Sequence, residues 1–493
     1  MAQSNIVPTL TGSFPRLQSL WKRHRLFIGL ATGVWLIYLA FLPPGIYSVD
    51  GNSMLAVSES LITQHNLGVP VDLGVVGRNG LTFSSWYPLL SLLAVPLVYA
   101  ASILSRFAHL PLHYVAAIFS LVLSGVFTAA TSSLVAALSV RLGCSLRGAW
   151  LAGLSFAFGT IALVYARTFF AEPLLALLTV GAMSLAFGRS RTEISSAACL
   201  AALAVLAKPT GIVIGPILSV YLLAKSENPR AWLLPFCGSL LGFALYAGYN
   251  EWRFGNPLTF GQSWTFSLSH IPRGIAGLLF SPGFGLFWYC PVLVLAALAF
   301  RLVARSYFLE ALTTVAIFIA FLLLHSAWAS WQGGWSWGPR FLLPGLPGLC
   351  ALMGSLTGNR RRWLVFFSLL GFLVNSPTLL FFYERCFAEL NEQGVSFDRD
   401  LAWSMNYAPL LQGWPAAIRT VKDASRQDVK QLFNNRGAPS ATIAKSRALR
   451  IVAVWWWVLP VANLSRWVGL LVAIVLVVIG SSILARAAPS QSE

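Results

Sequence analysis

The stretch WKRHRLFIGLATGVWLIYLAFLPPGIYSVDGN, residues 21–52, decides the fold class of this chain. Basic residues open it, an apolar run follows over 26–42, and Pro43, Pro44 and Gly45 end that run. An apolar run of this length between a basic cluster and a helix-breaking turn predicts a membrane-spanning helix that begins in the cytoplasm. No small-residue cleavage site follows, so we expect this helix to be retained.

The composition of the whole chain agrees with this prediction. Its 493 residues are 57% hydrophobic and 10% charged, and the mean hydropathy is +0.71. Because soluble proteins carry roughly a quarter charged residues, this composition excludes soluble and disordered proteins. The net charge of +18 suits nucleic-acid binding, but the basic residues stand singly between apolar runs, as topology anchors do. We expect a polytopic, all-α membrane protein that binds no nucleic acid.

Other apolar runs long enough to cross a bilayer recur along the chain. Within 194–224, the sequence Lys208-Pro209-Thr210-Gly211 predicts two short spans that meet at a turn, because Pro and Gly break helices. The predicted spans are 26–42, 113–140, 148–166, 169–188, 194–207, 210–224, 231–250, 286–304, 307–326, 341–357, 363–383 and 465–485.

The segment 86–104 is also long enough to cross, but Pro88 and Pro96 interrupt it. If it lies along the outer face, most Lys and Arg residues of the short loops fall on the cytoplasmic side; if it crosses, this bias is lost. We therefore predict about twelve spans, with both termini in the cytoplasm.

This topology divides the chain into four regions. They are a cytoplasmic tail (1–25), a transmembrane catalytic module (26–383), an exported loop or small subdomain (384–464), and a last span with its cytoplasmic tail (465–493). In the first outer loop we expect two helices along the membrane surface, one from Met54 to Gln64 capped by Asn52-Ser53 and one over 86–104.

Two carboxylates at the outer membrane edge are candidate catalytic residues, since charges there are costly. Asp50 follows the first span and could act as a general base, or it could be a solvated loop carboxylate. Glu172 lies in a short turn between two spans and could serve the same site, or it could simply pair with Arg167.

Cations on the outer face run against the positive-inside rule, so they are candidates for holding an anion such as phosphate. Lys208 and Arg340 are the strongest of these. Arg253 and Arg273 are weaker, because Arg253 could pair with Glu251 and Arg273 could be a solvated loop charge.

Tryptophans gather in the tract 325–340, with Gly333, Gly334 and Gly338 between them. Tryptophans at this depth often form only a membrane belt. The intervening glycines favour a binding role for Trp335 and Trp337 against a sugar ring or an isoprenoid chain. The sequence has no nucleotide-binding loop and no metal-ligand spacing.

Four segments resemble the GT-C superfamily of membrane glycosyltransferases, in particular the bacterial relatives of protein O-mannosyltransferases and aminoarabinose transferases. They are ARTFFAEP (166–173), AKPTG (207–211), LFSPGFGLF (279–287) and GWSWGPRF (334–341). Two features differ from the family pattern. Gly51 follows Asp50 where many members have a second acid, and Phe83-Ser84-Ser85-Trp86-Tyr87-Pro88 replaces the usual His-Pro or Lys-Pro.

The resemblance implies an inverting hexosyl- or pentosyltransferase that uses a polyprenyl-phosphate sugar. Asp50 would be the catalytic base, Glu172 the second acid, and Lys208 and Arg340 the phosphate ligands. The acceptor would be a glycan, a lipid or a protein, and the site would face the outer side of a bacterial inner membrane. Some members use a divalent cation, and that alternative stays open here.

Two other functions compete with this one. A transporter or lipid flippase would place its charges at the bilayer midplane and show internal repeats, which the sequence lacks. A polysaccharide ligase or polymerase of related architecture would depend on outer arginines more than on Asp50.

The topology can be tested with reporter fusions. A phosphatase reporter joined after residue 110 should be active because it is exported, and one joined after residue 145 should be inactive. The reverse pattern, with the fusion after residue 145 active and the fusion after residue 110 inactive, would mean that 86–104 crosses the membrane.

Overall fold

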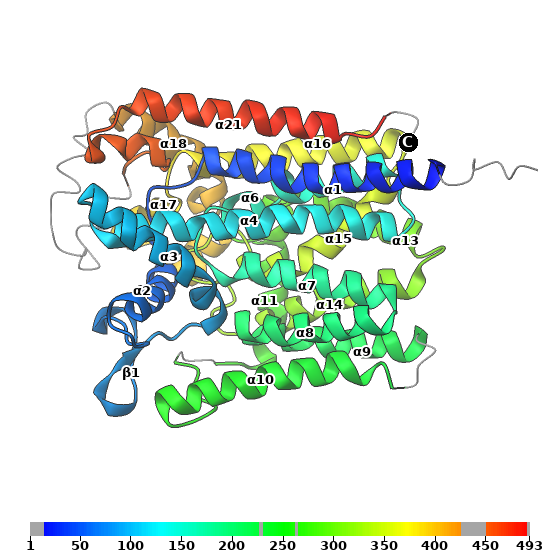
Figure 1. The fold of residues 1–493 in the computed structure, drawn as a ribbon, viewed down its shortest axis with the longest axis horizontal. Coiled ribbons are helices and arrows are strands. Elements are labelled where there is room, and N and C mark those ends of the chain that lie inside the picture. The colour runs from blue at the N-terminus through cyan, green and yellow to red at the C-terminus, as the bar shows by residue number, and fades with distance from the viewer. Residues whose placement is uncertain (1–13, 226–229, 262–264, 425–449, 491–493) are drawn as a thin grey trace, which may run out of the picture.

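The computed structural model describes residues 14–225, 230–261, 265–424 and 450–490. Within these ranges the chain is almost wholly helical. It has one two-stranded antiparallel sheet, in which β1 (Val75–Val76) pairs with β2 (Thr82–Phe83). Figure 1 shows the long helices lying side by side along the longest axis of the molecule. The protein is an all-α polytopic membrane protein, which confirms the predicted fold class.

Each predicted span is occupied by one helix or by a run of short helices. Within the described ranges, six helices are long and apolar enough to cross a membrane on length and composition; the number of crossings stays a prediction. The elements that cover the predicted spans are α1 (Phe14–Ala40), α4 (Leu112–Arg141), α5 (Leu146–Gly159), α6 (Ala162–Tyr165), α7 (Ala171–Gly188), α8 (Arg191–Ala207), η3 (Pro209–Val213), α9 (Ile214–Lys225), α10 (Leu233–Phe254), α12 (Leu286–Tyr289), η5 (Pro291–Leu295), α13 (Ala296–Val303), α14 (Phe308–Ser326), η6 (Arg340–Gly345), α15 (Leu346–Leu352), η7 (Met353–Ser355), α16 (Gly358–Asn375), η8 (Ser376–Leu379) and α21 (Arg466–Ala487).

The segments between them carry further short elements. They are α2 (Val49–Thr63), η1 (Val71–Leu73), η2 (Arg78–Gly80), α3 (Pro88–Ala108), η4 (Leu268–His270), α11 (Ile271–Phe280), α17 (Glu384–Glu392), η9 (Phe397–Leu401), η10 (Met405–Tyr407), α18 (Pro409–Ala424) and η11 (Trp455–Ala462).

Helix α1 begins and helix α21 ends at the same end of the bundle (Figure 1). Helices α2, α3, α17 and α18 gather at the opposite end, which we call the α2 end. This arrangement agrees with a topology in which the termini share one side of the membrane.

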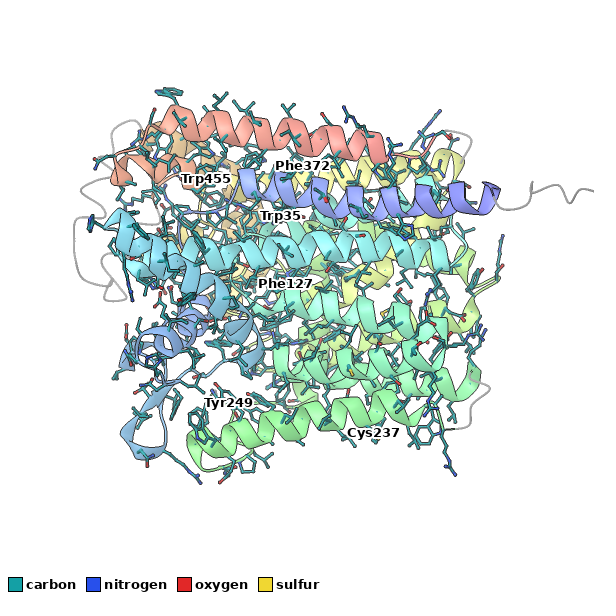
Figure 2. All side chains as sticks on the ribbon, viewed as in Figure 1. Trp35, Phe127, Cys237, Tyr249, Phe372 and Trp455 are labelled. Carbon is teal, nitrogen blue, oxygen red and sulfur yellow. The ribbon has the colours of Figure 1, made fainter. Side chains whose placement is uncertain are left out.

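Helix α3 does not run the length of the bundle, although its composition would allow it to cross. Its start is tied to the C-terminal end of α10, where Arg253 donates hydrogen bonds to the main-chain carbonyls of Ser84 and Trp86. Its end leads directly into the start of α4. Both of these places lie at the α2 end (Figures 1 and 2), as expected for a helix along the membrane surface.

Helix α2 begins earlier than the sequence predicts. We expected Asn52-Ser53 to cap a helix from Met54, but the cap is Ser48, whose side chain accepts a hydrogen bond from the Gly51 amide at 3.2 Å. Ser48 takes the extended backbone typical of an N-cap. The earlier start places Asp50 in the first helical turn rather than in a loop.

The described part of the region 384–464 packs on the α2 end of the bundle. The main chain of Trp455 donates to the Leu42 carbonyl at 2.8 Å, and its indole donates to the Leu39 carbonyl at 3.0 Å. Residues 425–449 of this predicted subdomain, like residues 1–13 of the predicted tail and 491–493, lie outside the described residues.

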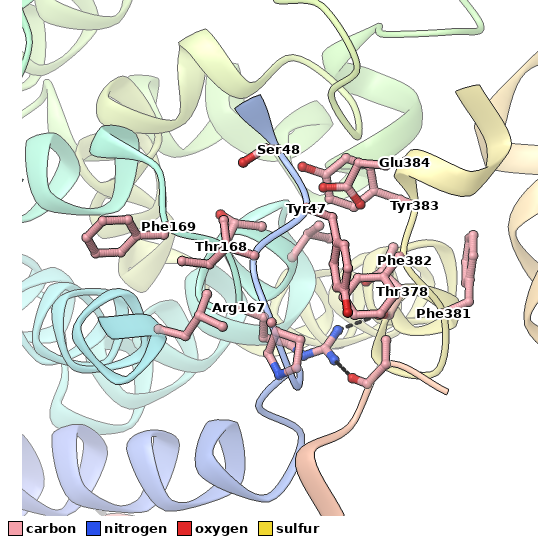
Figure 3. Close-up of a pocket in the computed structure, with 16 residues that line it drawn as sticks. Tyr47, Ser48, Arg167, Thr168, Phe169, Thr378, Phe381, Phe382, Tyr383 and Glu384 are labelled. Atoms are coloured by element: carbon pink, nitrogen blue, oxygen red, sulfur yellow. Dashed lines mark hydrogen bonds between the residues drawn. The ribbon is translucent and has the colours of Figure 1, made fainter. Parts of the chain in front are cut away.

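Arg167 joins three distant parts of the chain at this end (Figure 3). Its buried guanidinium donates hydrogen bonds to the main-chain carbonyls of Phe41, Thr378, Leu379 and Ala453. Because buried carbonyls need donors, one side chain holds together the end of α1, the η8 segment and the segment just before η11.

We predict that Arg167→Ala destabilises the protein by about 3 kcal/mol or more, because several buried carbonyls lose their donor. Thermal unfolding in detergent measures this effect. Arg78→Ala is the matched control, since the Arg78–Glu251 ion pair is about half exposed and removing it should cost less than about 1 kcal/mol. Equal stability losses in the two variants would contradict the assignment.

Candidate active site

A cavity of about 450 Å³ opens at the α2 end of the bundle. Its wall is built from the start of α2, the turn before α7, the tryptophan-rich tract and the start of α17. The lining residues are Tyr47, Ser48, Val49, Asp50, Trp86, Phe170, Trp328, Ser330, Gly333, Gly334, Trp335, Arg340 and Glu384.

Asp50 and Arg340 form an ion pair in the wall of this cavity. Arg340 Nη2 lies 2.9 Å from Asp50 Oδ2. The Arg340 side chain is 7% exposed and that of Asp50 is 19% exposed. Asp50 is therefore the more accessible of the two charged groups to a molecule in the cavity.

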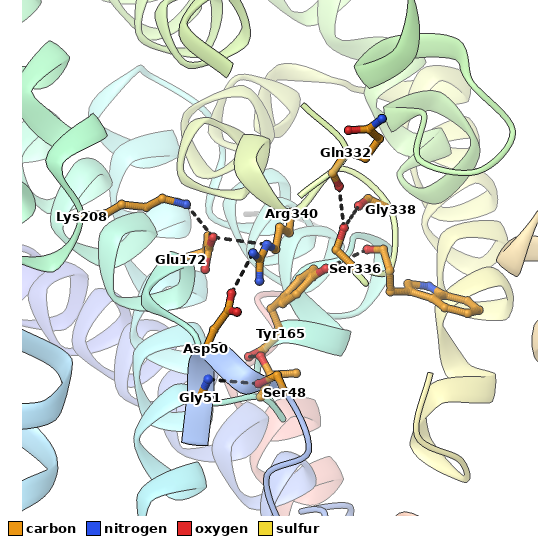
Figure 4. A network of polar contacts seen from close by, with 12 residues as sticks. Ser48, Asp50, Gly51, Tyr165, Glu172, Lys208, Gln332, Ser336, Gly338 and Arg340 are labelled. Atoms are coloured by element: carbon orange, nitrogen blue, oxygen red, sulfur yellow. Dashed lines mark hydrogen bonds and ion pairs between the residues drawn. The ribbon is translucent and has the colours of Figure 1, made fainter. Parts of the chain in front are cut away.

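Glu172 and Lys208 continue the charge network behind Arg340. Lys208 Nζ lies 2.7 Å from Glu172 Oε1, and Arg340 Nε lies 3.8 Å from the same oxygen. Figure 4 shows the resulting order, with Arg340 between Asp50 and Glu172 and with Lys208 beyond Glu172. The four charges alternate in sign, so the two acids and the two cations compensate one another.

Local backbone structure explains why these side chains meet. Asp50 and Glu172 both occupy the first turn of a helix, α2 and α7 respectively, where the helix dipole stabilises a carboxylate. Lys208 precedes Pro209 and has an extended backbone that ends α8, because a residue before proline avoids the helical conformation. The chain turn at this point carries the Lys208 side chain to Glu172.

Gly51 explains why this chain lacks a second acid after the first span. A Cβ atom at position 51 would lie 2.7 Å from the Ile46 side chain and 3.1 Å from the Phe169 carbonyl oxygen. The turn that places Asp50 against Arg340 therefore leaves no room for a side chain at the next position.

Aromatic rings cover the faces of both cations. The guanidinium carbon of Arg340 lies 4.4 Å from the centre of the Phe170 ring and 5.1 Å from that of Phe341. Lys208 Nζ lies 4.1 Å from the Phe341 ring centre. These cation–π contacts hold the cations in place and keep water off them.

Burial and the neighbouring charges act in opposite directions on the cations. Burial alone would lower the pKa of Arg340, but Asp50 and Glu172 raise the pKa above its ordinary value. Burial lowers the pKa of Lys208, and Glu172 opposes this lowering.

The structure brings together four of the predicted site residues, Asp50, Glu172, Lys208 and Arg340. Of these, only Asp50 and Arg340 line the cavity. Trp335 also lines it, next to Gly333 and Gly334, whose φ angles of 79° and 69° are readily adopted only by glycine.

Three other predicted residues are not among those that line the cavity. Arg253 is fully buried at the end of α10, where it also donates to Asn250 Oδ1 at 2.6 Å. Arg273 is exposed in the first turn of α11. Trp337 is fully buried, and its indole donates to Asn375 Oδ1 at 3.0 Å.

Two of the alternative ion pairs are wrong. Arg167 donates to main-chain carbonyls, and Glu172 pairs with Lys208 instead. Glu251 pairs with Arg78 at 2.8 Å rather than with Arg253.

The sequence analysis missed several residues that line the cavity, Glu384 among them. Glu384 begins α17 directly after the predicted span 363–383. The criterion that selected Asp50, a carboxylate just beyond the end of a span, would also have selected Glu384. Trp86, Phe170 and Trp328 line the cavity too, but only the tertiary structure distinguishes them from ordinary apolar residues.

The charge network does not fit a divalent cation. Among the described residues, no group of three or more His, Cys, Asp or Glu side chains could hold a metal ion. Asp50 and Glu172 each already have a cationic partner within 3 Å.

No protein-family model and no curated protein sequence matches this chain. Its fold is similar to that of ArnT from Cupriavidus metallidurans bound to undecaprenyl phosphate. The identity is 14%, the TM-score is 0.48, and the match covers 94% of this chain and 77% of that one. It is also similar to the oligosaccharyltransferase AglB from Archaeoglobus fulgidus in complex with an inhibitory peptide and a dolichol-phosphate, with 11% identity, a TM-score of 0.40, and 88% and 60% of the two chains covered.

A double-mutant cycle tests whether Glu172 and Lys208 act as a buried pair. We predict that Glu172→Gln and Lys208→Met each lower the free energy of unfolding by about 3–5 kcal/mol. The first leaves the buried Lys208 charge without its partner, and the second leaves Glu172 with only the longer 3.8 Å contact to Arg340. The double variant should lose less than the sum, with a coupling of about 1–3 kcal/mol. The exposed pair Arg78–Glu251 is the control and should couple by less than about 1 kcal/mol; additive losses at 172 and 208 would contradict the pairing.

Proposed function

We propose that this protein is a glycosyltransferase that moves a sugar from a polyprenyl-phosphate donor to an acceptor hydroxyl. The observation that carries the proposal is the Asp50–Arg340 ion pair in the wall of the cavity. It places a cation and a carboxylate side by side, and these are the two groups that such a transfer requires. A lipid-linked sugar already carries its leaving group, so the reaction needs no nucleotide.

Arg340 is the group that we assign to the donor phosphate. A guanidinium binds phosphate through two parallel hydrogen bonds, and the acids around Arg340 keep it charged. As the bond between the sugar and the phosphate breaks, negative charge grows on the phosphate, and a fixed cation stabilises that charge.

Asp50 is the group that we assign as general base. It takes the proton from the acceptor hydroxyl while the oxygen of that hydroxyl attacks the anomeric carbon. The new carbon–oxygen bond forms as the old one breaks, and the electron pair of the old bond leaves with the phosphate. A single displacement of this kind inverts the anomeric carbon.

In the resting site, Arg340 holds the Asp50 carboxylate in an ion pair of 2.9 Å. A donor phosphate carries negative charge that competes for the same guanidinium. We therefore infer that the donor binds first, takes hydrogen bonds from Arg340 and thereby frees Asp50 to act as a base.

Glu172 and Lys208 serve this site as positioning residues. Neither residue lines the cavity. We therefore assign them to holding the Arg340 guanidinium in position on its side away from the cavity. The family resemblance suggests a direct contact between Lys208 and phosphate. The buried 2.7 Å pair with Glu172 favours the indirect role.

The position of the charges also bears on the competing functions. The paired charges lie at the ends of helices, in the first turns of α2 and α7 and directly after α8, rather than midway along the helices, where a transporter holds its substrate. We place this end on the outer face of a bacterial inner membrane, on the basis of the distribution of basic residues in the loops.

Asp50→Asn tests the proposed base. Transfer from a labelled undecaprenyl-phosphate sugar in membranes should fall by about 100-fold or more, because the amide cannot accept the proton, while the fold is kept. Arg340→Gln should instead weaken donor binding. Asp72→Asn, which changes an exposed carboxylate of the same loop, is the control and should retain activity; full activity of both Asp50→Asn and Arg340→Gln would remove this mechanism.

A further inference from the structure

We propose that helix α18 binds the lipid surface of the membrane at the α2 end. Successive residues of a helix lie about 100° apart around its axis, and this spacing divides α18 into three sides. One side packs on the protein, one is apolar and exposed, and one is polar and exposed. A helix that lies where protein, lipid and water meet needs these three sides.

The packed side of α18 is made mostly of small residues, which are Pro409, Gly413, Ala416, Ala417, Thr420 and Ala424. Gly413 allows the closest approach, since a Cβ atom there would lie 2.8 Å from the Trp337 ring and 3.4 Å from Pro377. This side holds α18 against η8 and so fixes which residues point outward.

The apolar side of α18 is exposed. It consists of Leu411, Trp414, Ile418 and Val421, whose exposed fractions lie between 40% and 53%. Their spacing of three and four residues places them next to one another on the helix surface. A contiguous exposed apolar patch of this kind marks a contact surface.

The neighbouring helix α16 indicates what covers this apolar side. The Trp414 indole donates a hydrogen bond to the Leu373 carbonyl of α16 at 3.1 Å. Leu369 and Leu373 are 63% and 53% exposed and share one side of α16, which is apolar enough to cross a membrane. That side of a spanning helix faces lipid. The apolar side of α18 continues it past the end of α16, so we assign the bilayer as its partner.

The polar side of α18 points away from this apolar surface. Arg419 and Asp423 are exposed there, and Arg419 Nη2 lies 3.5 Å from Glu389 Oε2 of α17. A helix on a membrane surface buries its apolar side about 5–10 Å into the boundary between headgroups and acyl chains, and it keeps its polar side in water. The exposed sides of α18 meet both requirements.

Helix α18 is joined to the candidate active site through α17. The Arg385 guanidinium donates to Thr420 Oγ1 at 2.8 Å, and Arg385 directly follows Glu384, which lines the cavity. The lipid contact of α18 therefore fixes the height of one cavity wall relative to the membrane surface.

Fluorescence quenching tests the lipid contact without any substrate, so the result does not depend on the proposed function. Bimane is attached to a cysteine introduced by Ile418→Cys on the apolar side, by Asp423→Cys on the polar side, or by Leu369→Cys on α16. The parent chain carries Cys144→Ser, Cys199→Ser and Cys237→Ser, because these three thiols are not fully buried. The full chain is placed, one copy per disc, in nanodiscs of phosphatidylcholine with or without bromine on the acyl chains near the headgroup.

We expect the brominated lipid to quench bimane at 418 at least about threefold more than bimane at 423, because the first lies in lipid and the second in water. Quenching at 418 should approach that at 369, the control for a lipid-facing position. Thermal unfolding of each labelled variant checks that the fold is kept, and all three labels replace exposed side chains.

Three results would overturn the proposal. Equal quenching at 418 and 423 would mean that the apolar side does not contact lipid. Stronger quenching at 418 by bromine near the methyl ends of the acyl chains would place α18 inside the hydrocarbon rather than at its surface. Loss of the quenching at 418 when two copies share a disc would mean that this side binds a second copy of the chain.

Discussion

The arrangement of the α2 end depends on one guanidinium held between two carboxylates. Arg340 lies against Asp50 on one side and Glu172 on the other, and Lys208 completes the charge balance. An unpaired charge at such a buried place would cost several kcal/mol. Four segments must therefore meet in the correct register, or the charges are left uncompensated. They are the start of α2, the start of α7, the break after α8 and the start of η6.

The same balance gives the site its chemical character. Under the proposed function, the donor phosphate must replace the Asp50 carboxylate as the partner of Arg340 before the transfer begins. The Phe170 and Phe341 rings cover the guanidinium face and limit where that anion can approach. Under the proposed function, donor binding and base activation are thus two results of one exchange of partners at Arg340.

Much of the architecture follows from the sequence because the membrane imposes it. A long apolar run can satisfy its main chain in lipid only as a helix, so the helices that occupy the predicted spans and the break at Lys208-Pro209 were predictable. The start of α2 was not, since several polar residues there could act as the cap and only the surroundings select Ser48. Arg167 was also misjudged, because an arginine near a glutamate in sequence suggests an ion pair, whereas its actual acceptors are carbonyls from distant segments.

The sequence by itself determined that this chain is a helical membrane protein. It also identified Asp50, Glu172, Lys208 and Arg340 as candidate site residues, because a charged residue at the edge of an apolar span is costly unless it has a partner or a function. Only the tertiary structure decided which charge pairs with which, since the four lie on segments far apart in the chain and the pairing depends on distances of a few ångströms. It likewise separated Trp335, which faces the cavity, from Trp337, which is buried against Asn375. It also showed that Glu384, whose position just beyond a predicted span the sequence does reveal, lines the cavity, since the orientation of a side chain depends on how whole helices pack.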